Sequence, residues 1–211
     1  MSNMVIDDKF VATSELWAKF KPKFVCVLLL LLGGVSTMST AQSNNSSTTT
    51  IDFQQSQELD NWVIVNDTVM GGRSLAQLVI NDSRLAFSGI LSLENNGGFA
   101  SIRRVYNGKI WSSDKPIKIE VKGDGREYQL RFRTNRQVDD VHYSASFKTK
   151  AGEASVFQFN QTDFVSQFRG RIVSDSPALD FANIEQVGLV LADGNPGEFM
   201  LLVERISQPP E

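Results

Sequence analysis

The chain has 211 residues, of which 41% are hydrophobic and 21% are charged, and these fractions are typical of a globular protein. Lys and Arg number 21 against 24 Asp and Glu, so the formal net charge is −3. This charge argues against a nucleic-acid partner, because binding to a phosphate backbone needs a basic face. A single Cys and a single His exclude a structural zinc site rich in these residues.

The first 41 residues have the pattern of a signal peptide or an N-terminal anchor. Lys19, Lys21 and Lys23 precede an apolar run at 24–32, and small residues at 39–41 resemble a cleavage site. The run is shorter than the roughly 20 residues of a membrane-spanning helix. The sequence does not decide between a cleaved signal peptide and an uncleaved anchor. In either case the pattern predicts export, to a periplasm or to the outer face of an inner membrane, with membrane contact only through this segment.

The rest of the chain is predicted to contain one domain. Residues 42–50 read QSNNSSTTT, which predicts a flexible polar leader. Residues 51–207 contain no internal repeat and no second linker, so they are expected to form a single β-sandwich domain. Residues 208–211 form a tail that contains two prolines and cannot continue a strand.

Apolar side chains in this domain recur with a period of two. Strict alternation at 117–121, 128–132 and 143–147 is typical of strands with one face in a core. Further strand-like runs lie at 62–65, 75–80, 85–90, 100–105, 155–159, 187–191 and 199–206, with turn signals between them. We interpret 161–186 as a long connection with one helical turn near 181–184. Together these runs predict an all-β fold, an antiparallel β-sandwich of jelly-roll type.

Two loops carry the most unusual residues. The first, 65–74, contains the candidate contact residues Asn66, Asp67, Met70 and Arg73. One interpretation is a loop that faces a partner; the other is a tight connection in which Asp67 caps its own backbone and pairs with Arg73.

The second loop, 93–101, contains Asn95 and Asn96 beside two glycines. Their amides suit hydroxyl or carbonyl partners, and they are equally typical of turn chemistry alone.

Three arginines and one tryptophan are further candidates for ligand contact. Arg103, Arg131 and Arg133 occupy polar positions of predicted strands, so they can share one sheet face. Such a face suits acidic sugars, phosphates or carboxylates, and the alternative is a solvated face paired with nearby acids. Trp111 either stacks on a sugar ring or belongs to the core.

No catalytic constellation is recognisable. His142 is the histidine that a hydrolase would have to use, and it lies in a strand-like run without partners at a catalytic spacing. The stretch 193–197 is too short for a calcium loop of the EF-hand type and is read as a turn. The sequence therefore predicts no catalytic residue, no metal and no cofactor.

Several motifs taken together resemble the complex I intermediate-associated protein 30 family. The matching pieces are VNDTVMGGRS at 65–74, FSGILSLENNGGFASIR at 87–103 and VKGDGREYQLRFRT at 121–134. The resemblance covers nearly all of 51–207 and implies a galactose-binding-like β-sandwich. It also implies a non-catalytic assembly role, since mitochondrial members of the family help to assemble respiratory complex I.

The functional prediction combines this resemblance with the export pattern. It is an exported, non-catalytic binding or assembly factor that acts on a protein partner, such as a respiratory or envelope complex. The loops 65–74 and 94–99 would form the contact surface. The alternative is a carbohydrate-binding module with a glycan ligand, using Trp111, the three arginines and the asparagine pair.

Overall fold

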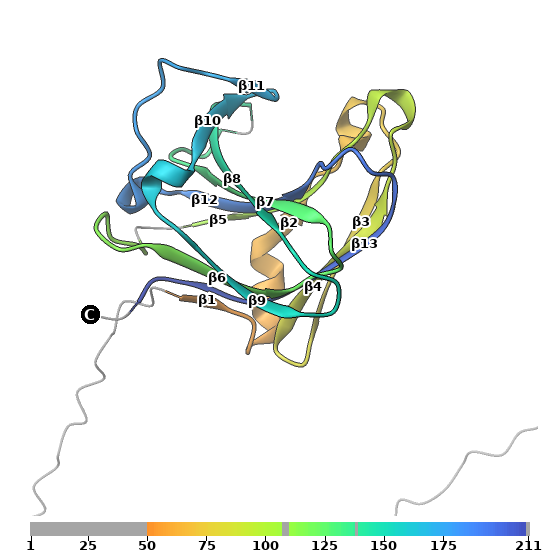
Figure 1. Ribbon diagram of the computed structural model, residues 1–211, viewed down its shortest axis with the longest axis horizontal. Helices are drawn as coiled ribbons and strands as arrows, with labels where there is room; N and C mark the ends of the chain where they lie inside the picture. The colour runs from red at the N-terminus through yellow and green to blue at the C-terminus, as the bar shows by residue number, and fades with distance from the viewer. Residues whose placement is uncertain (1–49, 107–109, 138, 210–211) are drawn as a thin grey trace, which may run out of the picture. The chain divides into compact units, whose positions relative to one another are not determined.

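A computed structural model describes residues 50–106, 110–137 and 139–209. They form two antiparallel β-sheets that pack face to face (Figure 1), which confirms the predicted all-β sandwich. The predicted signal segment and most of the polar leader lie outside the described residues. Within the described part of the chain, no helix is long and apolar enough to span a membrane.

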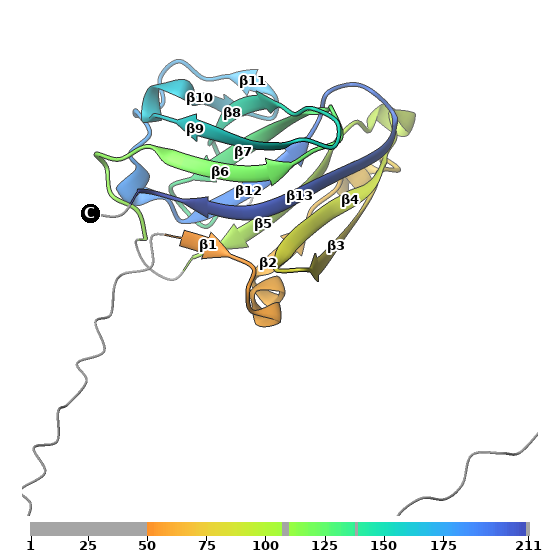
Figure 2. The same ribbon diagram turned by 60° about the horizontal axis from the view of Figure 1, so that its bottom comes forward.

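One sheet has six strands, with the order β3–β4–β13–β6–β9 and with β1 paired to β13. Figure 2 shows this sheet from its outer side. Its strands are β1 (Thr50–Asp52), β3 (Leu75–Asn81), β4 (Arg84–Leu91), β6 (Ile117–Lys122), β9 (Ala154–Phe159) and β13 (Gly197–Ser207).

The other sheet has seven strands, with the order β11–β10–β8–β7–β12–β5–β2. Its strands are β2 (Trp62–Ile64), β5 (Ala100–Val105), β7 (Glu127–Arg133), β8 (His142–Lys148), β10 (Val165–Phe168), β11 (Arg171–Ile172) and β12 (Gln186–Leu191). In each sheet a late strand holds a central place: β12 pairs with β5 and β7, and β13 pairs with β4 and β6.

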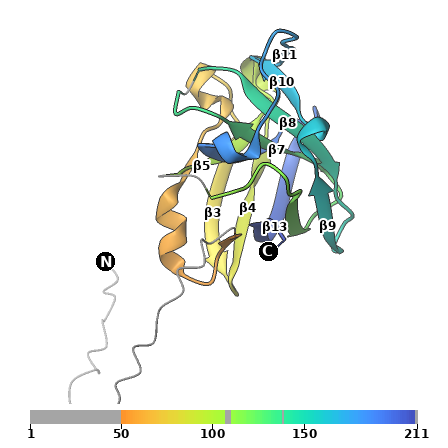
Figure 3. The same cartoon turned by 90° about the vertical axis from the view of Figure 1, so that its left-hand side faces the viewer.

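Short 3-10 helices connect some of the strands. They are η1 (Ser56–Asn61), η2 (Asp67–Met70), η3 (Glu94–Asn96), η4 (Gln161–Asp163) and η5 (Phe181–Asn183). Figure 3 shows η1 running beside β3 at the edge of the sandwich. Glu58 of η1 accepts a hydrogen bond from the Trp62 indole (3.1 Å) and pairs with Arg104, so this turn is fixed to the seven-stranded sheet.

The core lies between the sheets and is built by the predicted alternation. Tyr128, Leu130 and Phe132 of β7 are fully buried, while the residues between them face the other side of the sheet. Phe132 contacts Trp111, Phe164 and Phe181, so aromatic rings join the connecting segments to the sheet. Burial of large aromatic side chains contributes much of a core's stability.

The segment 161–186 differs from the predicted long connection. It contains the expected turn, η5, but also the strands β10 and β11. Val165, Ser166 and Gln167 pair with β8, and only Val165 is apolar among them, so the apolar pattern gave no strand signal. The chain end also has a structural role: Gln208 is buried, and its amide bonds the backbone of Ser112 and Lys115.

Candidate functional site

The two predicted contact loops are joined at one buried carboxylate. We call residues 65–74 and 92–99 the loop pair. Asp67 is 0% exposed, and its oxygens accept bonds from the Ser74 amide (2.9 Å), the Ser74 hydroxyl (2.6 Å), the Gly98 amide (2.7 Å) and the Phe99 amide (3.2 Å). One side chain therefore closes its own loop, as the capping interpretation predicts, and it also attaches this loop to the other, which the sequence did not predict.

The surroundings of Asp67 favour its ionised form. Burial alone would raise the pKa of this carboxyl, but the hydrogen bonds from Ser74, Gly98 and Phe99 outweigh it and lower the pKa. Two glycines make this approach possible. A Cβ added at Gly72 would lie 2.4 Å from the Asp67 carboxyl carbon, and one added at Gly97 would lie 2.6 Å from a carboxylate oxygen. The glycines of both loops are thus needed to enclose the carboxylate.

The surface of the loop pair is formed by other side chains. Val69 is 71% exposed and Met70 is 68% exposed. Arg73 does not pair with Asp67; its guanidinium lies 2.8 Å from Glu94 of the second loop. Met70 and Arg73 thus lie where the contact interpretation needs them, whereas the Asp67 side chain points inward. Figure 1 shows η2 and η3 side by side at one end of the sandwich.

The asparagines of the loop pair make backbone contacts. Asn66 is buried, and its side-chain oxygen accepts a bond from the Ser101 amide (3.4 Å). Asn95 donates to the Gly71 carbonyl oxygen (3.2 Å), which is a further link between the two loops. Asn95 and Asn96 both have left-handed backbone conformations, with φ of 56° and 57°. Asparagine tolerates this region better than most residues, so both positions fit turn chemistry.

The three arginines lie on one face, as predicted. Strand register places Arg103, Gly188, Arg131 and Ser144 in one row across β5, β12, β7 and β8. Arg133 lies in the next row, opposite Gln186. All point away from the core, because the residues that alternate with them belong to the core cluster. We call this outer surface of the seven-stranded sheet, with its three guanidiniums, the arginine face.

Trp111 and His142 occupy different surroundings. Trp111 is 4% exposed and packs against Tyr106 and Phe132, so it lies in the core and not on a ligand surface. His142 lies on β8 beside the arginine face. Burial and the charges of Arg131 and Arg133 lower its pKa to about 3, so the imidazole is neutral at physiological pH.

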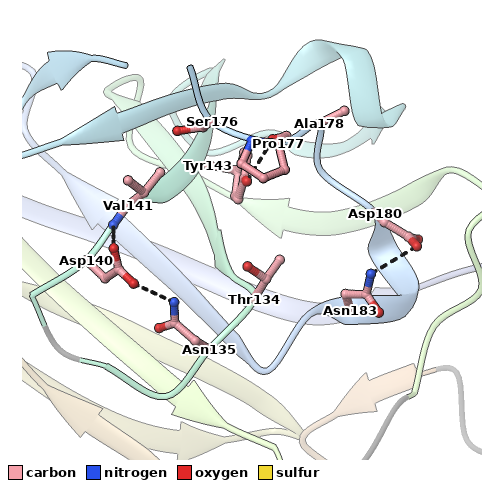
Figure 4. A pocket seen from close by; sticks show the side chains of 10 residues that line it. All are labelled: Thr134, Asn135, Asp140, Val141, Tyr143, Ser176, Pro177, Ala178, Asp180 and Asn183. Atoms are coloured by element: carbon pink, nitrogen blue, oxygen red, sulfur yellow. Dashed lines mark hydrogen bonds between the residues drawn. The ribbon is translucent and has the colours of Figure 1, made fainter. Parts of the chain in front are cut away.

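A pocket of about 280 Å³ lies between the β7–β8 connection and the segment before η5 (Figure 4). Asp140 accepts bonds from the Asn135 amide (2.6 Å) and the Val141 backbone (2.7 Å), and the Tyr143 hydroxyl donates to the Pro177 carbonyl oxygen (2.9 Å). The sequence interpretation did not include this pocket. Its walls come from segments about 40 residues apart, so spacing along the chain gave no signal.

An ion pair fastens the turn at 193–197. Arg126 donates to both carboxylate oxygens of Asp193 (3.0 and 2.6 Å), and both side chains are largely buried. The Asn195 amide donates to Asp193 as well (3.1 Å). Among the described residues, no group of three or more His, Cys, Asp or Glu side chains is placed to hold a metal ion.

The fold and the loop geometry define a galactose-binding-like β-sandwich. Solved structures with this arrangement include the family 11 carbohydrate-binding module of the cellulosomal cellulase Lic26A-Cel5E of Clostridium thermocellum. Its TM-score is 0.52 at 15% identity, covering 72% of this chain and 89% of the module. The same module in complex with a β-1,3-1,4-mixed-linked tetrasaccharide gives a TM-score of 0.53 at 15% identity, covering 79% of this chain and 99% of the module. At this identity the likeness is one of fold.

The sequence comparison is more specific. Residues 51–203 match the profile of the complex I intermediate-associated protein 30 family, and the chain belongs to that family. A similar relative is the mitochondrial complex I intermediate-associated protein 30 of Mus musculus, 27% identical over 177 residues, covering 73% of this chain and 53% of the relative. The probable mitochondrial family member of Caenorhabditis elegans is also 27% identical, with 73% and 52% covered. The chain thus spans about half the length of the curated relatives it matches.

These relatives contradict the predicted location. Export to a periplasm, or tethering at the outer face of an inner membrane, does not agree with relatives that are named as mitochondrial proteins. The prediction was wrong because lysines before a short apolar run show only that a segment suits a membrane surface. That pattern does not identify which membrane the segment meets.

Proposed function

We propose that this chain is a non-catalytic assembly factor that binds a protein partner belonging to respiratory complex I or to one of its assembly intermediates. The contact surface is the loop pair. Family membership supports the kind of partner, and the mitochondrial relatives carry complex I association in their names. The observation that carries the proposal is a pair of loops, joined by hydrogen bonds to Asp67, that exposes Val69 and Met70 to solvent.

The loop pair has the properties of a preorganised contact surface. Asp67 fixes both loops from within, so little conformational freedom is lost when a partner binds. Methionine and arginine are enriched at protein interfaces, and Met70 and Arg73 are both exposed here. Because the Asp67 carboxylate is saturated by donors, it cannot act as an acid or base while the loops stay folded. This favours binding over catalysis.

A glycan-binding function is the second candidate, and it is favoured by the fold shared with family 11 carbohydrate-binding modules. Flat aromatic side chains on the surface are a common means of holding a sugar ring. The tryptophans and tyrosines of the described residues are at most 6% exposed: Trp62, Trp111, Tyr106, Tyr128 and Tyr143. Stacking on these rings would require the core to open, so we rank this candidate second.

The test is affinity recovery of the tagged full chain from a detergent extract of respiratory membranes. Val69→Glu places a charge on the loop pair, and Val156→Glu is the matched control on β9, where the valine is 62% exposed. We expect the wild-type chain and Val156→Glu to recover the same complex I subunit. Val69→Glu should recover at least about tenfold less of this subunit, since a charge in an apolar contact costs well over 1.4 kcal/mol of binding free energy.

Two results would contradict the proposal. One is recovery of the subunit by Val69→Glu at the wild-type level, with melting temperatures of all three chains unchanged. The other is the absence of any complex I subunit from the wild-type sample. Binding of a mixed-linked glucan tetrasaccharide, measured by calorimetry, would then support the second candidate.

A further inference from the structure

The three guanidiniums of the arginine face take part in none of the ion pairs found among the described residues. Eight ion pairs are formed among the described residues, and they include Arg104 with Glu58 and Arg126 with Asp193. None of the eight involves Arg103, Arg131 or Arg133. Arg131 instead donates to the neutral Gln129 side chain (3.1 and 2.7 Å), and Arg133 donates to the Asp140 carbonyl oxygen.

This arrangement disfavours the charged forms of all three guanidiniums. Burial, followed by the charge of Arg133, lowers the pKa of Arg131 to about 10. Burial lowers the pKa of Arg103. Burial together with the Arg103 charge lowers the pKa of Arg133, and the charges of Asp140 and Asp139 offset this only in part. Half-buried like charges repel one another more strongly than charges in open water. An anion bound between them would remove this repulsion.

The face also contains polar atoms that lack partners. Arg103 Nε, Ser144 Oγ and Gln186 Oε1 are buried and make no hydrogen bond. The His142 ring nitrogens likewise make no hydrogen bond, although the nearby Gln167 side chain and the Asp140 backbone oppose the lowering of the His142 pKa. Ser144, His142 and Gln186 are each more than nine-tenths buried. Unpaired buried polar atoms are rare in folded proteins, and each one needs an explanation.

The unpartnered atoms are of two chemical kinds. Arg103 Nε can only donate, which suits an oxyanion, whereas Gln186 Oε1 can only accept, which suits a hydroxyl group. The Ser144 hydroxyl and a neutral His142 can each donate and accept. A bare anion would satisfy the donors alone. A ligand that carries an oxyanion with hydroxyl groups beside it would satisfy both kinds.

A glycine lies in the middle of the arginine row. Gly188 leaves no side chain between Arg103 and Arg131, which lie on either side of it in one row. A Cβ at this glycine would lie 2.9 Å from the Ile102 carbonyl oxygen. Figure 1 shows β10 and β11 on one side of this face and η2 and η3 on the other, both standing above its strands.

We propose that the arginine face binds a small hydroxylated anion, a sugar phosphate or a sugar acid, with Arg103, Arg131 and Arg133 around the oxyanion. Ser144, Gln186 and His142 are the groups that meet its hydroxyls. This site is separate from the loop pair. The face provides charge and hydrogen bonds for recognition without an aromatic platform.

The experiment is calorimetric titration of the full chain with four probes: glucose 6-phosphate, glucuronate, glucose and inorganic phosphate. We expect one of the first two to bind, and the tighter of them identifies the source of the anion. Glucose should not bind measurably, and inorganic phosphate should bind about tenfold or more weaker than the better ligand, for lack of hydroxyls. Raising the salt concentration should weaken binding, because the attraction is between charges.

Two variants and a control distinguish ligand binding by these arginines from a purely structural role. Arg131→Gln and Arg103→Gln should each weaken binding about tenfold or more, because a charge-assisted hydrogen bond is lost. Neither should lower the melting temperature, since removing an uncompensated charge relieves repulsion. Arg205→Gln is the matched control on the other sheet, where Arg205 pairs with Glu120 (2.9 Å), and its affinity should stay unchanged.

Other outcomes would overturn the proposal. They are the absence of binding for both hydroxylated anions, equal affinity of Arg131→Gln and the wild-type chain, or binding of an acidic peptide where the small anions fail. A loss of melting temperature in both arginine variants, with affinity intact, would assign these residues to stability. Each result is independent of complex I recovery, so the two proposals can fail separately.

Discussion

Replacing Asp67 by alanine tests whether the loop pair is held from within. The change removes every oxygen that accepts from the Ser74, Gly98 and Phe99 amides, in a place that is 0% exposed. A buried N–H group without an acceptor costs roughly 1–3 kcal/mol. Three such groups, partly relieved when the loops open to water, give an expected loss of about 3–5 kcal/mol in the free energy of unfolding.

The assay is urea denaturation followed by tryptophan fluorescence, with Asp67→Asn as the isosteric partner. The asparagine can keep an oxygen where Oδ2 accepts three bonds, but its NH₂ group then faces the Ser74 amide. We expect it to lose about 2–3 kcal/mol. Asp60→Ala, at an exposed position of η1, serves as the control and should change little. A loss below about 1 kcal/mol for Asp67→Ala would refute this account of the loop pair.

The same carboxylate gives a pH signature. Its pKa is lower in the folded chain than its ordinary value of 3.8, because the hydrogen bonds from Ser74, Gly98 and Phe99 outweigh the opposing effect of burial. The stability it provides is therefore complete above that value and is lost as the pH falls through 3.8 toward the folded pKa. Asp67→Asn should lack this part of the acid dependence, so the wild-type and variant curves should converge in acid. Parallel curves would mean that Asp67 does not titrate differently in the folded chain.

Changes at two other places should also alter the stability of the fold. His142→Gln should reduce the loss of unfolding free energy between pH 6.5 and pH 5 by about 2 kcal/mol, because burial holds the folded pKa near 3 while the unfolded histidine takes up a proton. Urea denaturation at several pH values would show this, and an unchanged pH dependence would contradict it. Arg126→Met should cost about 3 kcal/mol in the free energy of unfolding, because Asp193 is left buried and unpaired, and Asp193→Asn should restore part of that loss in a double-mutant cycle.

The sequence predicted the sheets better than the loops. Strands such as β6, β7 and β8 were recognisable because each buries one face, and alternation records that directly. The same alternation placed Arg103, Arg131 and Arg133 on a common face. β10 escaped prediction because it lies near the sheet edge and its two apolar side chains, Val165 and Phe168, do not alternate. Pairing with β8 decides its structure, and periodicity does not.

The residues of the candidate site were harder to interpret singly. An aspartate that caps a loop and an aspartate that meets a partner look alike in sequence, and burial of Asp67 depends on amides 31 and 32 residues away. Trp111 has polar neighbours along the chain, yet Tyr106 and Phe132 enclose it. In both cases the deciding contact is made across the fold and leaves no local pattern.

The central places of β12 and β13 determine when the sandwich can form during synthesis. Before Gln186–Leu191 has been made, β5 and β7 have no strand between them. Before Gly197–Ser207 has been made, the β3–β4 pair and the β6–β9 pair are not joined to each other. Each sheet is joined by a strand from the last part of the domain, and β13 pairs with strands as early in the chain as β1 and β4. Pairing between strands that are distant in the sequence slows folding. A ribosome-bound chain therefore presents unpaired strand edges until β13 has been made, and unpaired edges are sites at which aggregation can begin.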